Sequence, residues 1–172
     1  MAAPKKIHLT QYLSTNGDGT GAISAIGDYS AAAEEFYIQA PSGSDLVIHR
    51  MLVTIQDAGT HDADGYGNRA ALTNGITVQY LDDDLTVLSD LSGGVTVKAL
   101  ADWATLCYDV ANVSFGQGDT FTQARWSLDK HGLPLELKEG QSLRVTLNDS
   151  MVDLVGHKFV VQGYSEQSYR QG

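Results

Sequence analysis

His61 is the histidine best placed for chemistry, because Asp62 follows it directly and Asp64 lies close behind. An imidazole beside carboxylates can hold a metal ion or transfer a proton near neutral pH. Residues 62–67 also contain part of a calcium-loop pattern, in which oxygen ligands alternate around a turn glycine. The glutamate expected at the twelfth loop position is Thr73 instead, and no second histidine is near in sequence. A solvated loop of aspartates and glycines is therefore the favoured interpretation, with His61, Asp62 and Asp64 as the place where a site would form.

Two further oxygen-rich segments have metal-binding alternatives. Asn16 and Asp18 begin a second partial calcium loop, whose twelfth position is Gly27. Residues 82–84 are three consecutive aspartates at the expected end of a strand. Adjacent residues of an extended strand point in different directions, so these carboxylates are expected to form a charged, solvated cap. No metal ligand is predicted.

Cys107 is the only cysteine in the sequence, so no intramolecular disulfide can form and no paired-cysteine zinc site exists. Nothing in its uncharged context lowers the pKa of its thiol, so it is expected to be buried packing. The sequence contains no Gly-x-Ser-x-Gly elbow, no phosphate-binding glycine loop ending in lysine and no His-Glu-x-x-His. Paired glycosidase carboxylates leave no sequence signature, so the 21 acidic residues neither support nor oppose such a site. We predict no catalytic residue, no cofactor and no enzymatic activity.

The other histidines and the tryptophans have structural interpretations. His49 lies on the apolar side of a strand pattern, which favours a core or interface position, whereas His131 and His157 adjoin turn-like segments and are expected at the surface. Trp103 and Trp126, together with the tyrosines, have the chemistry to stack on sugar rings, as in lectins with a β-sandwich. Trp126 alternates with small and apolar neighbours, so a core position is favoured for it.

Short runs of alternating apolar and polar residues, bounded by Gly, Asp and Asn, dominate the chain. Such runs predict β-strands, and their close spacing predicts a sandwich or barrel rather than alternating βαβ units. One short helix is expected within residues 98–106, where Leu100, Trp103, Ala104 and Cys107 can share a face. The expected strands are residues 35–39, 45–57, 75–81, 85–88, 95–97, 105–108, 121–128, 142–147 and 158–164.

The composition favours one folded domain and excludes several partner classes. The chain has 172 residues, 42% of them hydrophobic, and a formal net charge of −10 from 11 Lys and Arg against 21 Asp and Glu. Such an acidic chain repels nucleic acid and anionic membranes, so neither is predicted as a partner. No run of 18 apolar residues and no apolar signal core is present, which predicts a soluble protein made and kept in a reducing compartment.

Two regions are expected. Residues 1–34, rich in glycine and small side chains, are predicted to be an extended N-terminal arm outside the core, and residues 35–172 a β-sandwich domain. The predicted core residues lie on the apolar sides of the strand patterns. They are Val47, Met51, Val53, Ile55, Val78, Trp126, Leu143, Val145, Leu147, Phe159 and Val161.

The later half of the chain carries a family resemblance. The run Leu-Glu-Leu-Lys-Glu-Gly-Gln-Ser-Leu-Arg-Val-Thr-Leu at residues 135–147, continued to residue 151 and then by residues 157–164, resembles small jelly-roll virion proteins of tailed bacteriophages. These proteins stud or cement the capsid. The resemblance extends upstream to residues 36–57 and 73–80, and its elements are a pattern of strands and turns rather than a catalytic signature.

The resemblance implies a jelly-roll fold and a non-enzymatic virion structural protein. Such a protein decorates or cements the capsid exterior by binding the major capsid protein lattice, after synthesis in the host cytoplasm. A small symmetric homo-oligomer is expected, with a trimer implied by the three-fold positions of an icosahedral shell. The alternative is a carbohydrate-binding or receptor-recognition module, such as a fibre, tail or lectin-like domain. Its binding would be either calcium-assisted or independent of calcium.

Overall fold

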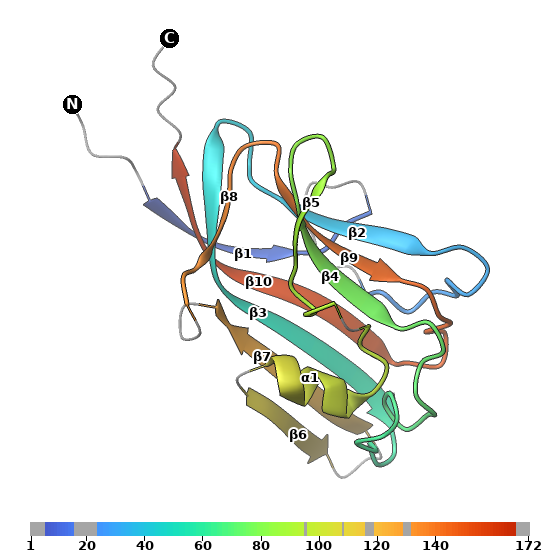
Figure 1. The fold of residues 1–172 in the computed structure, drawn as a ribbon. Coiled ribbons are helices and arrows are strands. Elements are labelled where there is room, and N and C mark those ends of the chain that lie inside the picture. Colours follow the sequence, from blue (N-terminus) through green and yellow to red (C-terminus); the bar gives the residue numbers. More distant parts are fainter. Residues whose placement is uncertain are drawn as a thin grey trace.

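The structure is a computed structural model that describes residues 6–15, 24–94, 96–107, 109–115, 119–128 and 132–167, and two antiparallel sheets pack face to face in it (Figure 1). The predicted all-β antiparallel sandwich is confirmed. The large sheet has the order β1-β10-β3-β7-β6, with β8 also paired to β3, and the small sheet has the order β2-β9-β4-β5. The large sheet consists of β1 (Lys6–Tyr12), β10 (Gly156–Gln167), β3 (Ser44–Ala58), β7 (Asp119–Ser127), β6 (Asp109–Phe115) and β8 (Leu135–Leu137). The small sheet consists of β2 (Glu34–Gln39), β9 (Ser142–Leu147), β4 (Ile76–Leu81) and β5 (Val87–Asp90).

The core lies between the inner faces of the two sheets. Alternation along each strand directs apolar side chains inward, because successive side chains of a strand point to opposite faces. Val145 of the central strand β9 is fully buried beside Phe36 of β2 and Val78 of β4. All the predicted core residues except Val47 belong to one hydrophobic cluster. Val47 is buried as well, but outside that cluster.

A β-bulge explains why Val47 and His49 differ from the prediction. The register between β10 and β3 shifts between Gln162 and Gly163, and the pairing passes over His49. This extra residue inverts the alternation, so Ile48 is fully buried in the core while His49 faces outward and is half-buried. Of the two positions predicted for His49, core or interface, the core position is therefore wrong. A side chain at Gly163 is excluded, because its Cβ would lie 1.8 Å from the carbonyl oxygen of Val47.

The N-terminal region is not an arm outside the core in its described part. β1 pairs along its whole length with β10, so the first strand of the chain lies beside the last one. Leu13 and Ala25 are buried in the hydrophobic cluster. The prediction for residues 1–34 is thus wrong for residues 6–15 and 24–34, while Asn16 and Asp18 lie outside the described residues. The alternation of Ile7, Leu9 and Leu13 was the signal that pointed to a strand.

Leu13→Ala tests whether this segment contributes to the core. We expect the free energy of unfolding to fall by about 2–4 kcal/mol, because the truncation leaves a cavity in a packed interior. Chemical denaturation of the purified variant measures the loss. Ile7→Ala is the matched control on the same chain segment, since Ile7 is 47% exposed and its truncation should cost less than about 0.5 kcal/mol. Equal losses for the two variants would contradict this assignment.

The segment before β6 contains the described helix, α1 (Leu100–Leu106), as predicted. Asp102 caps it by accepting hydrogen bonds from the backbone nitrogens of Lys98 and Ala99. The strand predicted at residues 105–108 is wrong for residues 105–107, because these residues form the last turn and the C-cap of the helix. The strand β6 begins only at Asp109. A strand at residues 95–97 is reduced to a single bridge between Val97 and Ile76.

Candidate functional site

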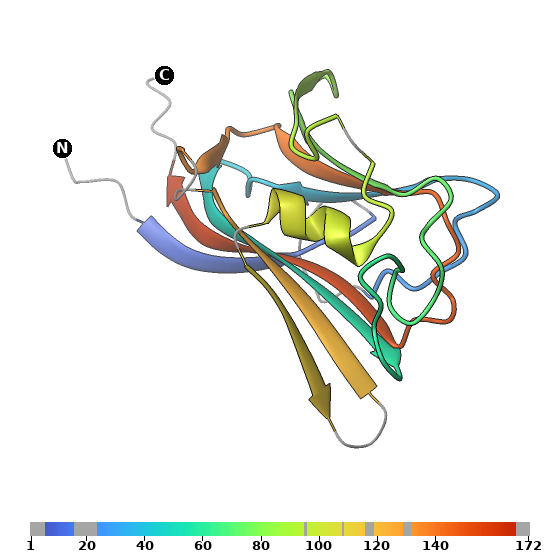
Figure 2. The ribbon, with the colours of Figure 1, turned by 60° about the horizontal axis from the view of Figure 1, so that its bottom comes forward.

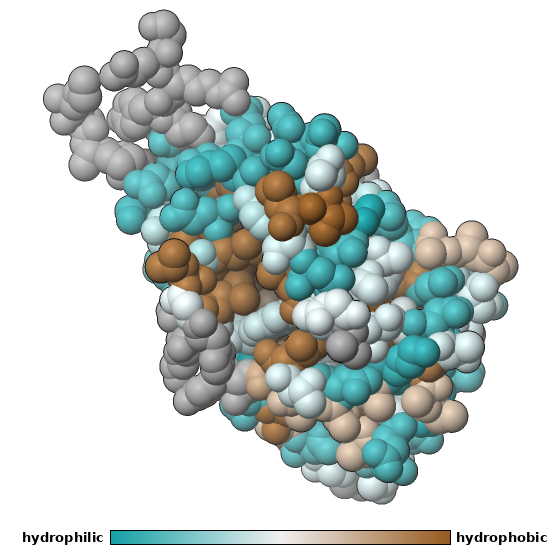
Figure 3. Space-filling model, in the orientation of Figure 1, coloured by the Kyte–Doolittle hydropathy of each residue, from teal (hydrophilic) through white to brown (hydrophobic). Residues whose placement is uncertain are grey.

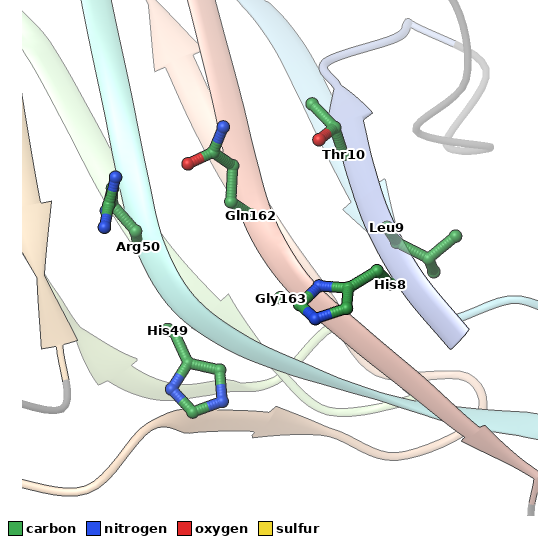
Figure 4. Close-up of a pocket in the computed structure, with 7 residues that line it drawn as sticks. All are labelled: His8, Leu9, Thr10, His49, Arg50, Gln162 and Gly163. Carbon is green, nitrogen blue, oxygen red and sulfur yellow. The ribbon is translucent and has the colours of Figure 1, made fainter. Parts of the chain in front are cut away.

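A shallow groove of about 420 Å³ lies on the outer face of the large sheet, across β1, β10 and β3 (Figure 4). Gly163, where the register between β10 and β3 shifts, is one of its lining residues. We call it the outer-face groove. It is lined by His8, Leu9, Thr10, His49, Arg50, Gln162 and Gly163.

The outer-face groove is cationic on a protein that is acidic as a whole. Arg50 is exposed, two histidines line the same depression, and none of the lining residues is a carboxylate. The ring of His49 packs against that of Tyr164 at 5.6 Å between centroids, and Lys6 Nζ lies 4.5 Å from the centre of the Tyr164 ring. A guanidinium beside imidazoles suits an anionic group, above all a carboxylate.

An exposed apolar patch lies at the edge of the small sheet, at the β4–β5 hairpin (Figure 3). Its members, Leu85, Val87 and Leu88, are 53%, 43% and 48% exposed, and β5 is the edge strand. We call this the hairpin patch. Unpaired edge strands with exposed apolar side chains are surfaces that other protein chains can cover.

The predicted candidate site at His61 is not assembled with its neighbouring aspartates. The His61 ring is buried, and its Nδ1 lies 2.5 Å from Thr122 Oγ1 of β7. Asp62 and Asp64 are exposed, and Asp62 accepts a hydrogen bond from the backbone nitrogen of Asp64. Burial lowers the pKa of His61, and the charge of Asp57 offsets part of that effect. The three residues therefore form a capped loop rather than a metal cluster.

The three aspartates at 82–84 come closer together than predicted. One carboxylate oxygen from each lies within 4.8 Å of the other two, because the chain turns here instead of remaining extended. Asp84 accepts a hydrogen bond from the backbone nitrogen of Thr86, which lowers the pKa of Asp84. Gln141 donates to Asp82. These contacts within the turn are those of a solvated hairpin end.

His157 is a buried residue, and its predicted surface position is wrong. Its side chain is fully buried on the inner face of β10, where Tyr66 Oη lies 2.8 Å from Nε2 and the carbonyl oxygen of Ala25 lies 3.1 Å from Nδ1. A carbonyl only accepts, so Nδ1 carries the proton and Nε2 accepts the Tyr66 hydroxyl hydrogen. Burial lowers the pKa of His157 to about 4. Its position on the inward alternation of β10, with Phe159 and Val161, was the available signal.

Two buried carboxylates have structural roles, because each accepts hydrogen bonds from the backbone. Asp149 accepts hydrogen bonds from the backbone nitrogens of Thr73, Asn74 and Gly75, and so holds the loop before β4 against the end of β9. Asp57 accepts from the backbone nitrogens of its neighbours Ala58 and Asn68. Each carboxylate is thus satisfied by N–H groups of an adjacent loop.

The cysteine and the two tryptophans contribute to packing in this fold. Cys107 is half-buried at the end of α1, and burial raises the pKa of its thiol to about 12. Trp103 is fully buried and Trp126 is 9% exposed, both within the hydrophobic cluster. Neither tryptophan presents a ring face to a sugar. His131 lies outside the described residues.

Comparison with known proteins adds no family. No family model matches the sequence, and no curated protein matches it either. Among the described residues, no helix has the length and apolar character needed to cross a bilayer.

Proposed function

We propose that this chain is a virion structural protein of a tailed bacteriophage, which decorates or cements the capsid exterior by binding the major capsid protein lattice. In this role it acts without catalysis and as a homo-oligomer, with a trimer as the proposed state. The observation that carries the proposal is the hairpin patch, because apolar side chains on an edge strand are suited to contact with another protein chain.

The strand order supports the proposal. The first strand pairs with the last in the large sheet, and the second pairs with the penultimate in the small sheet. This pairing of early strands with late ones supports the jelly roll that the sequence resemblance implies. The outer-face groove supplies a second contact surface, on the other sheet, suited to an acidic side chain of a partner.

Each of the two surfaces has its own role in the proposed decoration protein. The hairpin patch is proposed to cover a neighbouring copy around a symmetry axis, and the outer-face groove to contact the lattice. Many copies on one lattice add weak contacts through multivalency, so no single contact needs to be strong.

Removal of the hairpin patch tests the proposal. We expect the double variant Val87→Ser and Leu88→Ser to change the oligomer to a monomer, because the apolar area that drives association is lost. Light scattering at micromolar concentration measures the mass. Capsids of the phage that encodes the chain are then incubated with each protein, and the wild type is expected to sediment with them and raise their melting temperature.

Val152→Ser with Val155→Ser is the matched control, because these residues are 57% and 51% exposed but lie outside the hairpin patch. This control should keep both the oligomer and capsid retention. The proposal fails if the wild type is a monomer throughout this range and capsids neither retain it nor gain thermal stability. Tight binding in a glycan screen would favour a recognition module instead.

A further inference from the structure

A second groove, of about 370 Å³, is lined by residues of α1, β6 and β7 and of the loop after β3. Figure 2 shows α1 beside the β6–β7 pair. We call this second groove the α1 groove. It is separate from both surfaces of the proposed function. It is lined by His61, Ala63, Leu100, Ala101, Ala104, Val110, Asn112 and Thr122.

A hydrogen-bond chain sets the tautomer of His61 in this groove. Thr122 Oγ1 lies 2.6 Å from Asn112 Oδ1, an oxygen that only accepts, so the threonine hydroxyl donates its hydrogen there. Thr122 Oγ1 also lies 2.5 Å from His61 Nδ1 and has only lone pairs left to offer. His61 Nδ1 must therefore carry the ring proton, and Nε2 keeps a free lone pair.

That lone pair has no partner among the described residues. His61 Nε2 is buried without a hydrogen bond, in a side chain that is only 8% exposed. A buried polar atom left unsatisfied costs about 1–3 kcal/mol, and native structures rarely retain one without a purpose. Seven buried side-chain atoms of the described residues lack a hydrogen bond, and His61 is the only one of their residues that lines this groove.

The surroundings of the α1 groove define which donor fits. Five of its lining residues are apolar: Ala63, Leu100, Ala101, Ala104 and Val110. None of the lining residues is Lys or Arg, and the exposed carboxylates of Asp62 and Asp64 lie on either side of Ala63 in the chain. A long alkyl chain that ends in a cationic N–H donor satisfies all three features, and lysine has this structure.

We propose that the α1 groove binds a lysine side chain of a partner protein, whose ammonium group donates a hydrogen bond to Nε2 of His61. The alkyl stem lies along the alanines of α1, and the negative charge of Asp62 and Asp64 favours the ammonium. The imidazole remains neutral and acts as the acceptor. The neutral state is maintained near pH 7 because burial disfavours the charged ring.

Three small ligands test the lysine site on the full chain. Nα-acetyl-lysine N-methylamide is titrated into isotopically labelled protein, with the His61 ring and the α1 amides as NMR readouts. We expect saturable shifts of both. The norleucine analogue lacks the ammonium and the trimethyllysine analogue lacks its N–H donors, so each should bind at least about tenfold more weakly, as expected for one lost hydrogen bond. Equal binding of the three, or no shift with the lysine ligand, would overturn the proposal.

His61→Phe removes the acceptor and should abolish the preference for lysine over norleucine. Thr122→Val removes the group that holds the proton on Nδ1, so the ring nitrogen shifts should report a mixture of tautomers and weaker lysine binding. If either variant fails to fold, the ligand series on the wild type still decides the question. The result is independent of capsid binding, because free ligands are the probes.

Discussion

Val145→Asp is expected to prevent folding of the chain. Val145 is fully buried at the centre of the small sheet, between Phe36 on one neighbouring strand and Val78 on the other. A carboxylate at this position would have only apolar neighbours across the strands, and burial of an unpaired charge costs several kcal/mol. A domain of this size is stable by about 5–15 kcal/mol, so such a cost removes most or all of the folded population. Circular dichroism and NMR chemical-shift dispersion measure the loss.

The matched control introduces the same residue on the other face of the sheet. Thr77 lies on β4, next to Val78, and is half-buried on the outer side. Thr77→Asp leaves the charge in contact with water and should fold with a stability within about 1 kcal/mol of the wild type. A folded Val145→Asp variant would show that the core is not where the structure places it.

Acidification to pH 5 is expected to weaken the fold by about 2 kcal/mol through His157 alone. The pKa of His157 is lowered to about 4 by burial, whereas an unfolded histidine has a pKa of about 6.5. The unfolded chain therefore binds the proton first, and stability is lost as the pH falls from about 6.5 towards 4. Urea denaturation at pH 7 and at pH 5 measures the difference, at a pH where most carboxylates remain ionised.

His157→Gln separates this effect from other titrations. The glutamine amide can donate to the Ala25 carbonyl oxygen and accept from Tyr66, but it does not titrate. The variant should lose less stability between pH 7 and pH 5 than the wild type, whatever its stability at pH 7. His61, whose pKa is also lowered by burial, remains in both proteins and contributes equally. An identical pH response in both proteins would contradict the assignment to His157.

The environment of the His61 ring is set by residues from another part of the chain. Asp62 and Asp64 are its neighbours in the sequence, yet its hydrogen-bond partner is Thr122, which in turn donates to Asn112. The chemistry of the ring follows from those contacts. The carboxylates of Asp62 and Asp64 contribute charge to the surroundings instead of ligands.

The sequence by itself determined the fold class and ten of the 26 buried residues of the hydrophobic cluster. Alternation along residues 45–57, 75–81 and 142–147 predicted strands, because a strand buries every second side chain and this pattern is local. The short helix at residues 100–106 could also be predicted from the sequence, since Leu100 and Trp103 have helical spacing. Composition alone predicted an acidic chain of moderate hydrophobicity.

Only the tertiary structure determines which strands pair, and this pairing determines which side chains are buried and which are exposed. β1 pairs with a strand more than 140 residues later, so its local alternation can indicate a strand but not the strand with which it pairs. The bulge at Gly163 belongs to the register between two strands, and it alone moves His49 from the core to the outer-face groove. His157 is likewise buried by distant residues, since its Nδ1 donates to the Ala25 carbonyl oxygen and its Nε2 accepts from the Tyr66 hydroxyl. Burial and hydrogen bonding depend on residues that are distant in the chain, and this is why the tertiary structure, and not the local sequence, determines which side chains are exposed.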